Sequence, residues 1–328
     1  MTHNISEDAM SVDLSDVFDE QGLLEDDAEL SPKSAALLRS ILARQIGFED
    51  QTPSAAEAAL LVKDMLTLCA DMNDLLEFEA TQAMVAVGLA MIEDDASGDD
   101  DLMTLEVPLH LVNAEAARGL DDFDGAMGSS LAAVRLLQNE GFPMEDKRRK
   151  LSQAGAYLDI AQTALAQEDG NKSKQAAQAA LAIYQGLDEK LYMGKAHEQI
   201  ADAHGVNGDR AEAVASINTA IELFAEAQEM GPLSSGFARL ADLQMNDRNW
   251  EAGEQAVLAA VTAAPKDDIS VEFDGAMMAL VRLVKAKPER REILVHRVAE
   301  VAEMEAGLVS QKLVEFEKLN EMGGSLFD

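Results

Sequence analysis

Aromatic residues, cysteine and proline are scarce in this sequence. Of its 328 residues only 4% are aromatic, with one Trp and three Tyr, and there are seven Pro and a single cysteine, Cys69. A single cysteine excludes an intrachain disulfide and fits a reducing compartment. Because Cys69 lies in an apolar stretch, we expect it to be a small buried side chain.

Long apolar runs are also missing. No stretch of 18 or more apolar residues occurs, so we expect no membrane-spanning helix. Residues 1–8 have neither the basic start nor the apolar run of a secretory signal. Together with the cysteine content, these features predict a cytoplasmic protein that does not insert into membranes.

Basic residues are few relative to acidic ones. There are 26 Lys and Arg against 61 Asp and Glu, which gives a formal net charge of -35. Such a field repels nucleic acid and anionic lipid headgroups, so we expect neither as a partner. It favours a protein or peptide partner with basic segments, although high solubility alone explains the charge equally well.

What the sequence has in abundance is helix-forming apolar residues. Hydrophobic residues make up 48% of the chain, and most are Ala, Leu, Val, Ile and Met. Ala and Leu are strong helix formers, so the composition predicts an all-α protein of helices packed on helices. The first helices are expected to start at Ser31-Pro32, where Ser31 caps, and at Thr52-Pro53. A third is expected from about 75 to 92, and two more within 105–138.

The chain is expected to fall into five segments. Residues 1–31 hold ten carboxylates and no Lys or Arg, with Leu14 and Phe18 among the apolar residues between them. This composition is typical of a disordered acidic leader. The leader is either only a solvated extension, or a short motif that folds onto a partner or onto a basic patch such as residues 147–150. The other segments are an N-terminal helical region with a degenerate repeat over 32–145, repeats over 146–288, a long amphipathic capping helix over 289–322 and a flexible tail over 323–328.

A self-similarity with a period of 40 residues begins near residue 151. Small residues recur in register, and the positions are Ala161, Ala201 and Ala241, each followed nineteen residues later by Ala180, Ala220 and Ala260. In a helical hairpin, small residues at the crossing point let the two backbones approach, and stacked neighbours bury the remaining apolar surface. Turns between helices are expected at Gly208-Asp209 and over 247–250.

This pattern resembles the tetratricopeptide repeat. Ala201, Ala213 and Ala220 stand at the family's three small positions. The next unit matches at Leu240, Ala241, Trp250, Gly253, Val257, Ala260 and Pro265. The period exceeds the usual one of about 34 residues and is similar to the longer repeats of some scaffold and regulator members. The resemblance implies an α-solenoid of antiparallel helix pairs, wound into a right-handed superhelix.

The resemblance also implies a concave groove made by the first helix of each pair. The side chains expected to point into it are Asp159, Gln162, Glu198, Asp202, Arg239, Asp242, Arg282 and Lys285. The middle of this set is acidic and its C-terminal end is basic. A peptide with basic residues suits the acidic part; the alternative is that these are ordinary solvated helix faces.

No signature of an enzyme or of a metal site stands out. His197-Glu198 resembles the start of a zinc-protease motif, but Ala201 stands where that motif needs its second His. His204 lies two turns from His197, and the repeat predicts that both side chains pack against neighbours. The acidic run over 93–101 lacks the ligand spacing of a calcium-binding EF-hand, which favours a mobile acidic loop. We therefore expect no catalytic residue, no metal and no cofactor.

The sequence thus predicts a non-enzymatic scaffold, adaptor or chaperone-like factor that holds a partner protein or peptide in a helical groove. An alternative is a peptide-sensing regulatory protein whose solenoid changes curvature on ligand binding. A homodimer is left open.

Overall fold

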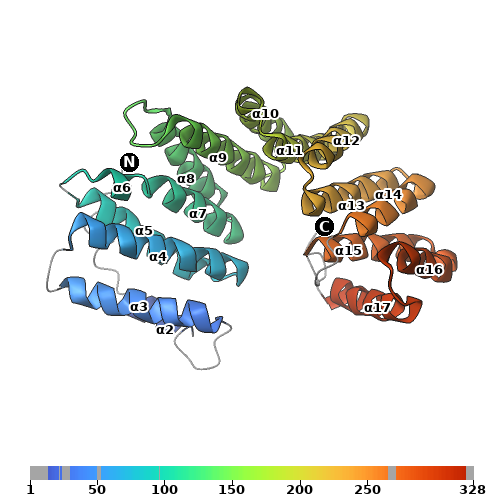
Figure 1. The fold of residues 1–328 in the computed structure, drawn as a ribbon, viewed down its shortest axis with the longest axis horizontal. Helices are drawn as coiled ribbons and strands as arrows, with labels where there is room; N and C mark the ends of the chain where they lie inside the picture. The colour runs from blue at the N-terminus through green and yellow to red at the C-terminus, as the bar shows by residue number, and fades with distance from the viewer. Residues whose placement is uncertain are drawn as a thin grey trace. The chain divides into compact units, whose positions relative to one another are not determined.

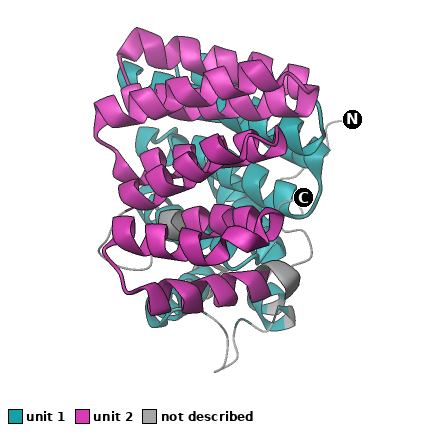
Figure 2. Ribbon diagram, turned by 90° about the vertical axis from the view of Figure 1, so that its right-hand side faces the viewer, with its two compact units in different colours: residues 1–169 teal, residues 170–328 magenta. Residues whose placement is uncertain are grey.

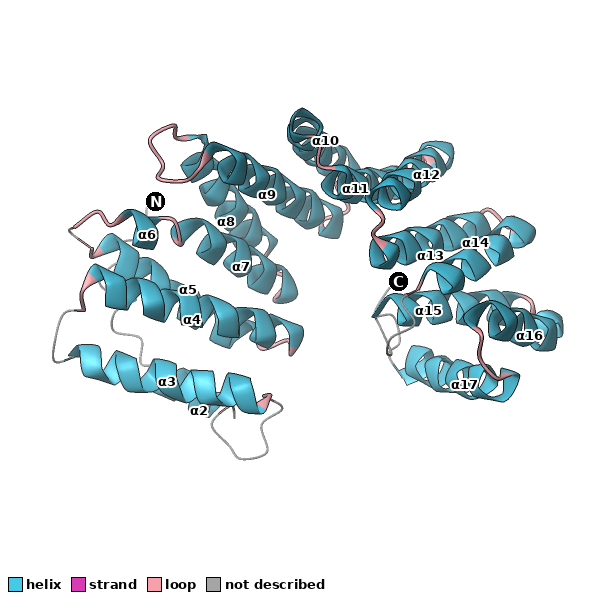
Figure 3. Ribbon diagram, viewed as in Figure 1, coloured by secondary structure: helices cyan, strands magenta, loops and turns pink. Residues whose placement is uncertain are grey.

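The computed structural model describes residues 14–21, 23, 30–49, 53–95, 97–264 and 271–322. Every regular element within these ranges is a helix (Figure 3), which confirms the predicted all-α class. None of the described helices is both long enough and apolar enough to span a bilayer. The helices form two compact units, divided between Asp169 and Gly170 (Figure 2).

The first unit is a series of helices in which each packs mainly on its neighbours in the chain (Figure 1). They are α2 (Leu14–Glu20), α3 (Pro32–Glu49), α4 (Ala55–Asp74), α5 (Phe78–Glu93), α6 (Asp100–Met103), α7 (Glu106–Gly119), α8 (Phe123–Gln138) and α9 (Asp146–Ala166). Its core is aliphatic and rich in Met, with Met65, Met72 and Met84 fully buried. Cys69 is buried among them as expected, and burial raises the pKa of its thiol to about 12, so it stays protonated.

Local capping sets the start of two helices. The Ser31 hydroxyl accepts a hydrogen bond from the main-chain N–H of Ser34 at 3.1 Å, which confirms Ser31 as the cap of α3. The next helix is capped by Ser54, not near Thr52 as expected. Ser54 and Glu57 form a reciprocal capping box, and this pairing stabilises the start of α4 two residues after the expected position at Thr52.

The expectation of a disordered leader is wrong for residues 14–20. This stretch forms α2, in which Leu14 and Phe18 are fully buried. Both side chains join the apolar core of the first unit, and α2 packs against α5. The physical reason is that Leu14 and Phe18 lie one helical turn apart, so a short helix places both on one face. Residues 1–13 and 24–29 of the expected leader lie outside the described residues.

The second unit holds the helix pairs of the repeat. Its helices are α10 (Gly170–Leu187), α11 (Lys190–Asn207), α12 (Arg210–Ala227), α13 (Met230–Asn246), α14 (Trp250–Ala263), α15 (Val271–Ala286), the short 3-10 turn η1 (Pro288–Arg290), α16 (Arg291–Ala302) and α17 (Ala306–Met322). The closest pairs are α11 with α12 and α13 with α14. The helices α10, α12 and α14 begin at residues 170, 210 and 250. Pro265, expected to close one repeat, lies outside the described residues.

Small residues at the helix crossings allow this close pairing. Ala201, Ala220, Ala241 and Ala260 are all buried, as the repeat predicts. At Gly194 of α11 the two helices leave no room for any side chain, because a Cβ built there would lie 2.4 Å from Cε1 of Phe224 on α12. The α11–α12 packing therefore depends on hydrogen in place of a side chain at residue 194.

The predicted turns fall where they were expected. Helix α11 ends at Asn207, and Gly208 follows with φ 79°, a left-handed conformation that favours glycine. Helix α13 ends at Asn246, and α14 begins at Trp250.

Two of the predicted segment boundaries differ from the structure. The repeats were expected to begin at residue 146, but α9 packs with α7 and α8 in the first unit. Consequently Ala161 and Ala180, expected at one crossing, belong to different units. The single capping helix predicted over 289–322 is in fact α16 and α17, separated at Glu303, which has φ 56°. The expected tail over 323–328 lies outside the described residues.

The charged residues of the C-terminal segment have a structural explanation that the repeat pattern did not supply. Glu254 of α14 is only 3% exposed, and it pairs with both Arg290 and Arg297. Arg291 of α16 pairs with Glu317 of α17 in the same way. The arginines are therefore needed in this segment, because Arg290 and Arg297 neutralise the buried carboxylate of Glu254.

Candidate functional site

The predicted groove residues lie on the first helices of successive pairs, but in two units. Asp159 and Gln162 are on α9 of the first unit. In the second unit, Glu198 and Asp202 are on α11, Arg239 and Asp242 on α13, and Arg282 and Lys285 on α15.

On the second unit, Arg239 bridges α13 and α11. Its guanidinium donates a hydrogen bond to the carboxylate of Asp202, and its Nε lies 3.6 Å from Oε1 of Glu198. Glu198 and Asp202 are four residues apart, so they lie on one face of α11. One arginine thus faces two carboxylates of the preceding first helix.

The same relation recurs one pair later. Arg282 of α15 donates a hydrogen bond to the carboxylate of Asp242 on α13. The two arginines therefore connect α11, α13 and α15 through charge-assisted contacts. We define Glu198, Asp202, Arg239, Asp242 and Arg282 as the ion-pair ladder. Lys285 is exposed and joins no ion pair with the part of the chain that the structure describes.

The ladder corrects one detail of the predicted charge pattern. The sequence suggested an acidic middle and a basic C-terminal end. In the structure Arg239 and Arg282 pair with acidic side chains of the preceding first helix, so most of this charge is neutralised within the unit. Three carboxylates face two guanidinium groups, which leaves an excess of one acidic group.

Two oxygen atoms of the ladder are buried and have no hydrogen-bond donor among the described residues. They are Oδ1 of Asp242 and Oε1 of Glu198, the second of which lies 3.6 Å from Nε of Arg239, just beyond hydrogen-bond distance. Burial raises the pKa of Glu198 to about 7, against a partial opposing effect of Arg239. Burial also raises the pKa of Asp242, with Arg282 opposing it. These carboxyl groups therefore have unused capacity to accept hydrogen bonds.

Arg239 stays charged despite its surroundings. Burial lowers the pKa of its guanidinium, but the carboxylates of Asp202, Glu198 and Asp242 outweigh that effect and hold the pKa above its ordinary value. The ladder thus holds a permanently charged Arg239 next to Glu198 and Asp242, two carboxyl groups whose pKa values are raised by burial.

On the first unit, Asp159 is paired by an arginine that the sequence did not single out. Arg118 of α7 lies 3.3 Å from the carboxylate of Asp159 and 3.5 Å from the Thr163 hydroxyl. Burial raises the pKa of Asp159 to about 6, and Arg118 only partly opposes this. Gln162 is exposed. Nothing local in the sequence marks this pair, because its two residues are 41 positions apart and lie on different helices.

The two histidines of α11 are not arranged as a metal site. His204 Nδ1 lies 3.2 Å from the carboxylate of Asp209, at the end of its own helix. His197 is half-buried, and burial lowers the pKa of its imidazole. Among the described residues, no group of three or more His, Cys, Asp and Glu side chains is placed to hold a metal ion.

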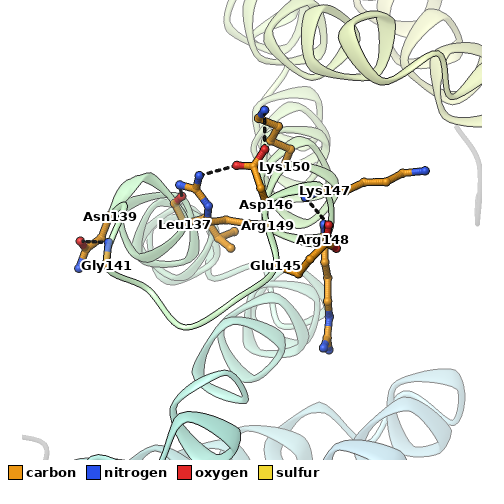
Figure 4. Close-up of polar contacts among 9 residues, drawn as sticks. All are labelled: Leu137, Asn139, Gly141, Glu145, Asp146, Lys147, Arg148, Arg149 and Lys150. Atoms are coloured by element: carbon orange, nitrogen blue, oxygen red, sulfur yellow. Dashed lines mark hydrogen bonds and ion pairs between the residues drawn. The ribbon is translucent and has the colours of Figure 1, made fainter.

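The basic run of residues 147–150 is partly used within the first unit (Figure 4). Arg149 donates hydrogen bonds to the main-chain oxygen of Leu137 at 3.2 Å and to Asp146 at 2.7 Å. Lys150 also pairs with Asp146. Arg148 extends its guanidinium away from these contacts. The run therefore ties the start of α9 to α8, and the described part of the leader packs against α5 instead of here.

Comparisons with known proteins give structural matches but no match in sequence. No family model and no curated protein matches this chain. A crystal structure of a Rap protein complexed with competence and sporulation factor is similar over 98% of this chain and 84% of its own length, with 14% identity and a TM-score of 0.55. The apo form of RapI covers 97% and 82% at 12% identity, with a TM-score of 0.54. BtubC from P. vanneervenii covers 73% and 90% at 14% identity, with a TM-score of 0.49. At such identities the likeness is one of fold: this chain is an α-solenoid of tetratricopeptide-like helix pairs.

Proposed function

We propose that this protein is a non-enzymatic, cytoplasmic binding protein, a scaffold, adaptor or chaperone-like factor that holds a partner protein or peptide on the ion-pair ladder of its second unit. The observation that carries the proposal is the pair of buried carboxyl oxygens, on Glu198 and Asp242, that lack a donor among the described residues. A buried acceptor without a donor is unfavourable, so a ligand that supplies donors there binds with a gain in free energy.

The chemistry of the ladder favours a cationic partner group. Three carboxyl groups face two arginines, and one further Lys or Arg side chain from a partner would favour the ionised form of Glu198 and complete the pairing. Because the ladder arginines already occupy the carboxylates, the incoming cation must share Asp242 with Arg282, or Glu198 with Arg239. The formal net charge of -35 attracts basic segments over a longer range and speeds their encounter.

The fold is compatible with this proposal. One solved structure with a similar fold is, by its title, a Rap protein complexed with competence and sporulation factor. That protein shares the helical architecture but only 14% of residues. The likeness supports a binding role for a fold of this kind, and the ladder chemistry supplies the argument for the face that binds and the ligand it takes.

Single-residue variants and a defined probe test the proposal. A short labelled peptide of alternating Lys and Ala is titrated into the wild-type chain and into Asp242→Asn, with binding followed by fluorescence anisotropy. We expect Asp242→Asn to weaken binding about tenfold, because it removes a carboxylate that the peptide cation needs.

A matched variant separates the ladder from general charge attraction. Glu212→Gln removes one carboxylate from an exposed position on α12, a second helix. This variant is expected to bind the peptide as the wild type does. Equal losses in Asp242→Asn and Glu212→Gln would show that only the net charge matters and would contradict the proposed site.

The ladder also supports a second candidate function, that of a peptide-sensing regulator. Arg239 and Arg282 connect three successive first helices, α11, α13 and α15. A ligand that competes for their carboxylates would loosen these connections and alter the spacing of the helices. Amide hydrogen exchange with and without the Lys–Ala peptide distinguishes the candidates. A regulator shows changed exchange in α17, which packs on α15 but holds no ladder residue, whereas a passive scaffold shows protection only in α11, α13 and α15.

A further inference from the structure

The helix α2 places two apolar side chains in the core of the first unit. Leu14 and Phe18 are both fully buried, and Leu23, just beyond the helix, is 6% exposed. They belong to the same apolar cluster as Leu38 of α3 and Met84 of α5. The surface beneath α2 therefore accepts two large apolar residues one helical turn apart.

A helix as short as α2 depends on this surface for its structure. It has seven residues, and isolated helices shorter than about 12 residues are barely populated in water. Its helical form is therefore maintained by contact with α5 and with the surrounding core. The surface acts as a template for a short amphipathic helix.

The acidic side chain of α2 that the structure describes, Asp19, takes no part in this attachment. The helix LSDVFDE contains three carboxylates and no basic residue. Asp19 is exposed and forms no ion pair with any residue in the described ranges. The acidic residues keep the segment soluble when it is detached, and the apolar pair provides the contact.

We propose that α2 is a displaceable internal ligand, and that the surface beneath it binds a short amphipathic helix of a partner protein with two large apolar side chains one turn apart. The partner segment would compete with α2 for the same contacts. This site lies in the first unit and is independent of the ion-pair ladder of the second.

The test uses the full-length chain with the substitutions Leu14→Ala and Phe18→Ala, and the probe is a labelled peptide with the sequence of residues 12–23. In the wild type the site is occupied by α2, so the peptide binds weakly. In the double variant we expect the peptide to bind at least about tenfold more tightly. A peptide that itself carries both alanines should not bind. A chain with Asp19→Asn, an exposed change on the same helix, should bind the peptide as weakly as the wild type does, because α2 still occupies the site.

Two further measurements keep the outcome decisive. Circular dichroism tests whether the double variant is folded. If the variant is unfolded, hydrogen exchange of the α2 amides is measured in the wild type instead. An excess of unlabelled peptide should then speed the exchange of these amides. Binding should not weaken as salt is raised, because both the peptide and the protein are acidic. The proposal is overturned if the folded variant fails to bind the peptide, if the alanine peptide binds as well, or if exchange in the wild type is unaffected. Asp242→Asn should leave all of these results unchanged, so failure here and failure of the proposed function are distinguishable.

Discussion

The guanidinium of Arg239 on α13 donates a hydrogen bond to the carboxylate of Asp202 on α11, 37 residues earlier in the chain. The same arginine faces Glu198, so one side chain on a first helix contacts two carboxyl groups on the previous one. This relation joins successive helix pairs on the face that the repeat assigns to partner binding, and it has consequences for stability, pH dependence and recognition.

Replacing this arginine tests the contribution of the ladder to stability. Arg239→Met leaves Glu198 and Asp202 facing each other without a cation. Because the Arg239 side chain is 41% exposed, the loss is moderated by solvent, and we expect the free energy of unfolding to fall by about 1 kcal/mol. Urea unfolding measures it. Arg210→Met serves as the control, since Arg210 is 64% exposed and pairs with Asp247, and it should change stability by less than about 0.5 kcal/mol. Similar effects of the two variants would contradict a special role for the ladder.

The pKa of Glu198 predicts a dependence of stability on pH. Burial raises this pKa from 4.5 to about 7, so the folded chain holds the proton more tightly than the unfolded chain does. The stability due to this proton is present at low pH and is lost as the pH rises from about 4.5 through 7. Glu198→Gln should flatten the pH dependence over this window and be more stable than the wild type at pH 8, by at most about 3 kcal/mol.

Denaturant unfolding at several pH values checks this expectation. Asp159, with its pKa raised to about 6 by burial, contributes in the same direction from the first unit, so the flattening in Glu198→Gln is partial. Glu212→Gln, on the exposed part of α12, should keep the wild-type dependence. A slope in Glu198→Gln identical to that of the wild type would rule out proton uptake at this residue.

Gly194 should not tolerate even a methyl group. A Cβ at this position would lie 2.4 Å from Phe224, so Gly194→Ala forces the α11–α12 pair apart and should destabilise the protein by about 1–3 kcal/mol. Gly205→Ala, on the same helix with nothing within 4 Å of its Cβ, should be neutral or stabilising by up to about 1 kcal/mol. Thermal unfolding of the two variants gives the comparison. If Phe224→Leu restores stability to Gly194→Ala, the steric cause is established; equal stability of the two glycine variants would refute it.

The buried carboxylate of Glu254 should hold the C-terminal helices in place. Glu254→Gln removes the charge that Arg290 and Arg297 share, and we expect a loss of about 1–3 kcal/mol in unfolding free energy. The loss should be local, so amide exchange should rise in α16 and α17 more than in α11 and α12. Glu251→Gln, an exposed change on the same helix α14, should leave the exchange unchanged. Uniformly faster exchange over the whole unit would indicate a general effect instead.

Local sequence features predicted the elements that depend on near neighbours. Ser31 as a cap and Gly208 as a helix end are decided within a few residues, so both could be placed without a structure. The end of the chain was less predictable, because nothing nearby marks Glu303 as the break between α16 and α17. The leader was misjudged because its composition is typical of disorder, whereas Leu14 and Phe18 are buried by helices that follow much later.

The candidate site was predictable only as a set of positions. The repeat placed Glu198, Asp202 and Arg239 on first helices, yet it could not show that they pair with one another. Their partners are separated by 37 residues or more, and the rotamer of a long side chain is chosen by the surrounding packing. Arg118 and Glu254 were missed for the same reason, since each has its partner on another helix.

By itself, the sequence determined that the chain is helical and that α11 pairs with α12 and α13 with α14, because helix propensity, caps and small residues act over one or two turns. Only the tertiary structure decided which charges neutralise each other, which carboxyl oxygens remain without a donor, and that α2 covers an apolar surface. Those outcomes depend on burial and on distances between helices, and neither exists until the helices have packed.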